Sequence, residues 1–126
     1  MLLHIFKSLK HSVSPEKIGD YQLTVSGMTI DTNVAYIKNL NAIIVKCKRT
    51  SGWFSASGNG YQNASVSLPS KYIPNIPISV VALADFSAQF AMSIEIKTDG
   101  KLYLTVSYTN GMNSYGINEV SGILFL

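Results

Sequence analysis

Three prolines within nine residues constrain this chain more than any other feature of its sequence. They are Pro69, Pro74 and Pro77, close to the middle of the 126 residues. Each proline fixes its own φ at about −65°, removes a backbone donor and moves the residue before it out of the helical region. The stretch Ser67 to Pro77 is therefore predicted to be an ordered extended crossing, and neither a helix nor a central strand.

Apolar and polar residues alternate with a period of two on both sides of this stretch, as they do in strands that are buried on one face. Strand-like segments lie at 21–25, 34–37, 42–50, 61–68, 78–84, 90–96, 102–107 and 117–126, of which 78–84 is an almost continuous apolar run. Turn signals separate them, of which Asp99-Gly100 is the clearest because it suits a tight hairpin turn. The pattern predicts an all-β fold, namely an antiparallel β-sandwich or jelly-roll-like domain.

The first residues follow a different period. Leu2, Phe6, Leu9 and Val13 recur at helical spacing, and Ser14-Pro15 ends the run. We predict a short N-terminal helix over 1–13, a stem and linker over 1–20, and a β-sandwich head domain over 21–126. A helix this short is marginal in water by itself. It packs on its own domain, joins its counterparts in an oligomer, or is a frayed end.

Only 13% of the residues are charged, whereas about 25% is usual for soluble domains. Such a surface is either rich in uncharged polar groups or buried against another copy, so we expect a homo-oligomer. The net charge of +3 comes from sparse clusters such as Lys46, Lys48 and Arg49. A nucleic-acid-binding face is normally denser in basic residues and carries aromatic ones, so no nucleic-acid partner is expected.

This sequence lacks the features that several other classes of protein require. No apolar run reaches the length of about 18 residues that a membrane helix needs, and the first residues lack the leading positive charge of a signal peptide. We therefore expect neither membrane insertion nor a signal peptide. Cys47 is the one cysteine, which excludes an intrachain disulfide. Its place in an alternating segment predicts a small buried hydrophobe.

The residues that carry chemistry are scattered along the chain. The carboxylates, at Glu16, Asp20, Asp31, Asp85, Glu95, Asp99 and Glu119, show no spacing that indicates a catalytic pair. His4 and His11 lack the further ligands that a metal site needs. We therefore predict no catalytic residues, no metal and no cofactor. A polysaccharide hydrolase is the alternative, and it would need a pair among Asp31, Asp85, Glu95 and Glu119.

Two loops combine aromatic residues with amides. Such a pairing suits a saccharide, because a sugar ring has an apolar CH face and a polar rim. The candidate ligand-binding residues are Trp53, Asn59 and Tyr61 around the first loop, and Tyr108, Asn110, Asn113 and Tyr115 around the second. The alternative for these aromatic side chains is packing in the core or at the sheet edges.

The proline stretch also carries a family resemblance. Leu68-Pro69-Ser70-Lys71-Tyr72-Ile73-Pro74 resembles the LP-x-x-Y-x-P junction in the C-terminal head domains of tail-fibre and receptor-binding proteins of phages and prophages that infect Gram-positive bacteria. Gly52-Trp53-Phe54 before it, and the Thr-Asp-Gly turn after it, follow the same order. The likeness covers about 21–126. The long virion-attachment region that usually precedes such heads has no counterpart in this chain.

The resemblance implies a trimeric head that binds a host cell-surface saccharide, with no enzymatic activity. It implies a place in the virion tail or in a prophage-encoded particle, acting at the host cell surface, with other tail proteins as further partners. The family's binding residues vary, so none is transferred to this chain. The alternative is a structural tail or baseplate component that binds no receptor. We expect the proline stretch to hold the chain where it passes between the two halves of the sandwich, and the loops to contact the ligand.

Overall fold

The computed structural model describes residues 15–55, 57–83, 90–108, 113–114 and 119–126. Its elements are β1 (Glu16–Val25), β2 (Met28–Ile37), the 3-10 helix η1 (Lys38–Leu40), β3 (Ala42–Ser51), β4 (Phe54–Ser55), β5 (Gly60–Ser67), the 3-10 helix η2 (Ser70–Tyr72), β6 (Ile78–Leu83), β7 (Phe90–Ile96), β8 (Lys101–Tyr108), β9 (Asn113–Ser114) and β10 (Glu119–Phe125). Every strand pair is antiparallel. The prediction of an all-β antiparallel fold is confirmed.

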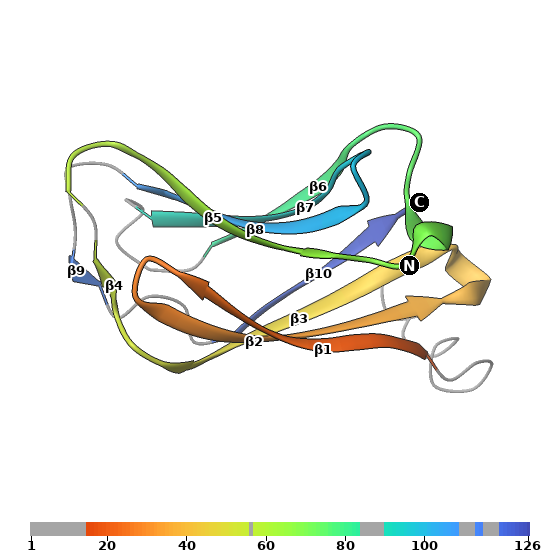
Figure 1. Ribbon diagram of the computed structural model, residues 1–126, viewed down its shortest axis with the longest axis horizontal. Coiled ribbons are helices and arrows are strands. Elements are labelled where there is room, and N and C mark those ends of the chain that lie inside the picture. Colours follow the sequence, from red (N-terminus) through yellow and green to blue (C-terminus); the bar gives the residue numbers. More distant parts are fainter. Residues whose placement is uncertain (1–14, 56, 84–89, 109–112, 115–118) are drawn as a thin grey trace.

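The strands form two layers, which Figure 1 shows one above the other. One sheet has the order β1-β2-β3-β10 and the other the order β5-β8-β7-β6, while β4 and β9 pair separately. In the second sheet, β6, β7 and β8 are neighbours in chain order. β5 precedes them in the chain but pairs with β8, as in a Greek key. The layers come close where β10 meets β6. A Cβ added to Gly122 would lie 2.5 Å from Cγ1 of Val80.

The core lies between the two sheets. Alternate residues of the central strands, such as β3 and β8, point inward. Buried side chains from both sheets form one cluster, for example Val45 on β3 with Ile94 on β7 and Leu104 on β8. Cys47 belongs to this cluster and is 2% exposed. Its prediction as a buried hydrophobe is therefore confirmed.

The first hairpin corrects the predicted boundaries. β1 begins at Glu16, so residues 16–20 belong to the sheet and not to a linker. A register shift between Lys17 and Gly19 interrupts the alternation there and conceals the strand in the sequence. Ser26 and Gly27 both have positive φ, 44° and 90°, as a two-residue hairpin turn requires. This turn lets β2 start at Met28, six residues before the predicted strand.

The proline crossing, residues 68–77, also differs from its prediction. It joins β5 to β6, which are the two edges of one sheet, instead of passing between two halves of the fold. It contains one turn of 3-10 helix, in which Tyr72 is 4% exposed. The Tyr72 hydroxyl donates to Glu16 Oε1 at 3.0 Å, and its ring lies 5.2 Å from that of Tyr36. The crossing is thus fixed to the opposite sheet.

The predicted N-terminal helix, residues 1–13, lies outside the described residues. Within the part of the chain that the structure describes, no helix has the length and apolar character needed to cross a membrane.

Candidate functional site

The described residues that flank the two loops predicted to bind a ligand lie at one end of the molecule. β4 pairs with β9 through Phe54 and Ser114, and Gly60 at the start of β5 pairs with Tyr108 at the end of β8. Figure 1 shows β4 and β9 closing this end between the two layers. We call it the aromatic end, defined by Trp53, Asn59, Tyr61 and Tyr108.

Two aromatic side chains of this end are presented to solvent. Trp53 is 58% exposed and Tyr61 is 68% exposed, values that are high for side chains of this size. Asn59 is exposed in the Gly-rich loop between them. Aromatic faces beside an amide provide the apolar and hydrogen-bonding surfaces that a sugar ring needs.

The other candidate residues differ in how the structure places them. Tyr108 is half-buried, and its ring packs against Phe54 with 5.4 Å between ring centroids. Its hydroxyl lies beside Gly60, where an added Cβ would come within 3.2 Å. Asn113 contributes backbone to β9, opposite Ser55. Asn110 and Tyr115 lie outside the described residues.

Close backbone packing fixes the loop that carries Trp53. Gly52 has a φ of 79°, and a Cβ added to it would lie 1.8 Å from the carbonyl oxygen of Gly27. The Arg49 guanidinium donates to the Gly52 carbonyl at 2.8 Å. The Ser55 amide donates to the Ser26 carbonyl at 3.2 Å. The β1–β2 turn therefore supports the backbone on both sides of Trp53.

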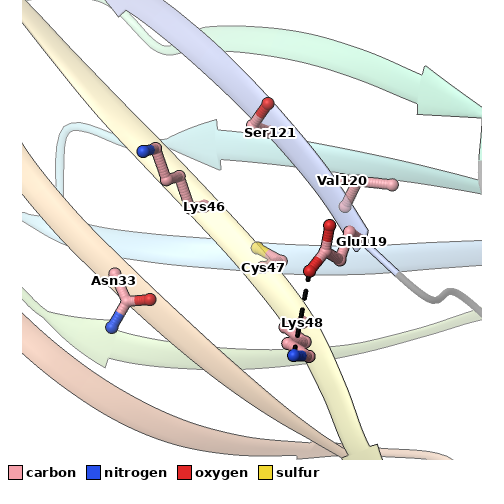
Figure 2. A pocket seen from close by; sticks show the side chains of 7 residues that line it. All are labelled: Asn33, Lys46, Cys47, Lys48, Glu119, Val120 and Ser121. Atoms are coloured by element: carbon pink, nitrogen blue, oxygen red, sulfur yellow. Dashed lines mark ion pairs between the residues drawn. The ribbon is translucent and has the colours of Figure 1, made fainter.

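A second candidate surface lies on the outer face of the sheet β1-β2-β3-β10. It is a depression of about 580 Å³, seen from close by in Figure 2. The residues that line it are Asn33, Lys46, Cys47, Lys48, Glu119, Val120 and Ser121. Lys48 and Glu119 form an exposed ion pair at 3.9 Å, drawn in Figure 2 as a dashed line. The depression presents both charges, an amide and a hydroxyl to solvent.

No local pattern in the sequence indicates this depression. The outward positions of Lys46 and Lys48 follow from the alternation in β3, which is visible in the sequence. The pairing of β3 with β10 brings Glu119 opposite Lys48 and Ser121 opposite Lys46. Because these residues are about seventy positions apart, no local pattern indicates their contact.

A smaller groove of about 240 Å³ continues from the depression toward β1. Asp20 at its edge is bound by Lys17 and accepts a hydrogen bond of 2.8 Å from Asn33. The bond from Lys17 and then that from Asn33 hold the pKa of Asp20 below its ordinary value. Asp20 is therefore an ionised, structurally engaged carboxylate at neutral pH.

Other carboxylates are engaged in the same way. Hydrogen bonds from Lys71 and then Tyr72 lower the pKa of Glu16, and one from Tyr103 lowers the pKa of Asp99.

Burial raises the pKa of the Cys47 thiol to about 11, so the thiol is protonated at neutral pH. Among the described residues, no cluster of three His, Cys, Asp or Glu side chains could hold a metal ion.

Comparison with protein-family models, curated proteins and solved structures found no match to this chain. The likeness to phage head domains therefore stays a prediction from the sequence.

Proposed function

We propose that this chain is a phage-type receptor-binding head, an adhesin domain that recognises a cell-surface saccharide as a homotrimer and has no enzymatic activity. The observation that carries the proposal is the pair of exposed aromatic side chains at one end, Trp53 at 58% and Tyr61 at 68%, with Asn59 in the loop between them. An exposed aromatic side chain on a supported loop, with an amide in the same loop, provides the kinds of group that contact a sugar ring.

The fold supports the proposal through its architecture. We interpret the two antiparallel layers as a β-sandwich of the jelly-roll kind, a scaffold that gathers loops at its two ends. Binding residues are concentrated on loops held by a rigid framework. The support that the β1–β2 turn gives to Trp53 fits this arrangement.

The trimer has support of its own on the outer face of the sheet β1-β2-β3-β10. Phe125 is 58% exposed there, and Ile123 and Ile44 are opposite each other on the neighbouring strands with intermediate exposure. An exposed apolar patch of this kind favours contact between copies. Several weak sites on one particle would then bind together and raise the overall affinity.

The experiment is a cell-binding and glycan-binding assay on the full chain. Trp53→Ala and Tyr61→Ala should each weaken binding at least about fivefold, since stacking of an aromatic ring contributes on the order of 1 kcal/mol or more. Ile76→Ala is the matched control, because Ile76 is 69% exposed and lies in the proline crossing. It should leave binding unchanged.

Two other outcomes would contradict the proposal. Failure to bind any cell or glycan, together with co-purification of a tail protein, would instead support a structural tail component. Turnover of wall polysaccharide that is lost on Ala substitution at Asp31, Asp85, Glu95 or Glu119 would support a hydrolase; Asp85 lies outside the described residues.

A further inference from the structure

The outer face of the sheet β5-β8-β7-β6 begins at the aromatic end and carries an unusual set of side chains. The register places Tyr61, Ser107 and Ala91 in one row across three strands, and Asn63, Thr105 and Ser93 in the next. Their neighbours along β7 and β8, such as Met92 and Val106, are fully buried. Because side chains alternate between faces, these six point outward. We call them the neutral face.

The neutral face presents hydrogen-bonding groups that remain available. Its hydroxyls and amide come from Asn63, Ser93, Thr105 and Ser107. None of these side chains makes a hydrogen bond within the described residues. Apart from the phenol of Tyr61, no ionisable group lies in either row.

Among the described residues of this face, charged side chains lie beyond these two rows, toward the β7–β8 turn. Glu95 pairs with Lys97 at 3.4 Å, and the Lys97 ammonium lies 4.4 Å from the centre of the Tyr103 ring. The Tyr103 hydroxyl donates to Asp99. This charged cluster bounds the neutral face at the end opposite to Tyr61.

The size of the neutral face exceeds that of one sugar ring. The second row continues to Val81 on β6, which is 69% exposed. Strands are spaced by about 4.8 Å, so a row across four strands spans about 14 Å. Several linked sugar rings can lie along such a row, with hydroxyls facing hydroxyls and Val81 against a CH face.

A second copy of the chain suits this face poorly. Cores of subunit interfaces are rich in aromatic and large apolar side chains, whereas these rows carry mainly Ser, Thr, Asn and Ala. Covering them with protein would remove water from hydroxyl and amide groups without giving each a partner. A polyhydroxylated ligand supplies those partners.

We propose that the saccharide site of the aromatic end continues across the neutral face, so that the chain binds an extended, uncharged polysaccharide through several consecutive sugar rings. This inference rests on the proposed function and names the class of its ligand. Tyr61 belongs to both surfaces and joins them. Asn63 and Thr105 lie in the second row, beyond Tyr61, so they contact an oligosaccharide but not a single sugar ring bound at the aromatic end.

The test is calorimetric titration of the full chain with ladders of neutral oligosaccharides, from one to six rings, of α-glucan, β-glucan, mannan and galactan types. Affinity for the recognised type should rise at least about tenfold from one ring to six. The double variant Asn63→Ala/Thr105→Val removes an amide and a hydroxyl while Val keeps the β-branched shape. It should weaken binding of the longest oligosaccharide about tenfold and leave single-ring binding unchanged.

Thr24→Val is the matched control, because Thr24 is an exposed threonine on β1 of the other sheet. It should not change binding. Equal affinity for one ring and six, with both lost in Tyr61→Ala, would overturn the extended site and leave the proposed function standing. Preference for a uronate ladder over every neutral one would also overturn it.

Two further results would be decisive. A change of molar mass in the double variant would show that the neutral face is a contact between copies, contrary to the inference. Binding of no saccharide in any ladder would overturn both this inference and the proposed function.

Discussion

At the scale of single residues, two glycines determine the geometry of the aromatic end. Gly52 combines a φ of 79° with a position where its Cβ would lie 1.8 Å from the Gly27 carbonyl oxygen. Gly52→Ala therefore introduces both a strained backbone and a backbone clash. We expect the midpoint of thermal unfolding of this variant to lie about 5 °C or more below that of the native chain. Saccharide binding at Trp53 should weaken as well.

Gly58→Ala separates the clash from the strain. Gly58 has a similar φ of 72°, but nothing lies within 4 Å of the position of its Cβ. Differential scanning calorimetry should show a clearly smaller loss for Gly58→Ala than for Gly52→Ala. Equal losses would mean that the contact with Gly27 has no structural importance.

The sequence predicts some residues of the candidate site better than others. The exposure of Trp53 and Tyr61 follows from their places beside a Gly-rich loop, which a sequence shows directly. The partial burial of Tyr108 depends on Phe54, which is far from it along the chain. The neutral face depends on the order β5-β8-β7 and its register, so no local pattern reveals it.

At the scale of elements, the proline crossing is held to β1 by one carboxylate. Glu16 Oε1 accepts hydrogen bonds from Lys71 at 3.1 Å and from the Tyr72 hydroxyl at 3.0 Å. The bond from Lys71, then that from Tyr72, lowers the pKa of Glu16 below its ordinary value of 4.5. A lowered pKa stabilises the fold above the pKa of the unfolded chain, and this stabilisation is lost as pH falls through the folded value.

Glu16→Gln should therefore lower the urea midpoint at pH 7, and the difference from the native chain should shrink as pH falls through the ordinary pKa of 4.5 and then through the lower folded value. Urea unfolding at pH 7, 5 and 3 measures this. Lys71→Met should reproduce part of the loss at pH 7, and the double variant should show less than the sum of both because the partners are shared. A Glu16→Gln difference of equal size at all three pH values would contradict this account.

The elements themselves divide into those that local sequence determines and those that it does not. Asp99-Gly100 and the Asn-rich turn at Asn39–Asn41 mark hairpins that the structure contains, since turn chemistry is local. The sequence does not indicate the β1–β2 turn, because Ser26 takes a positive φ, which serine adopts less readily than glycine. The prolines correctly predict a non-sheet crossing, yet they allow a 3-10 turn and do not specify which strands it joins.

At the scale of the whole molecule, the low content of charged residues and the exposed apolar patch around Phe125 both favour association between copies. Multi-angle light scattering at micromolar concentration should give a molar mass about three times the 13.7 kDa of one chain. Phe125→Ser removes the 58% exposed ring from that patch and should lower the mass. Ile76→Ser, at an apolar residue elsewhere that is 69% exposed, should leave the mass unchanged. A native chain that remains at 13.7 kDa would contradict the trimer.

The contact between Gly27 and Gly52 has a consequence for the energetics of recognition. Two loops whose backbones touch without intervening side chains lose little freedom when a ligand arrives, so the entropic cost of ordering them is already met on folding. The weak affinity of a single site would then reflect its small contact area, and further stiffening of the loop would bring little gain. Tighter attachment would have to come from more copies or longer ligands, and its rate would be set by diffusion and orientation more than by conformational search.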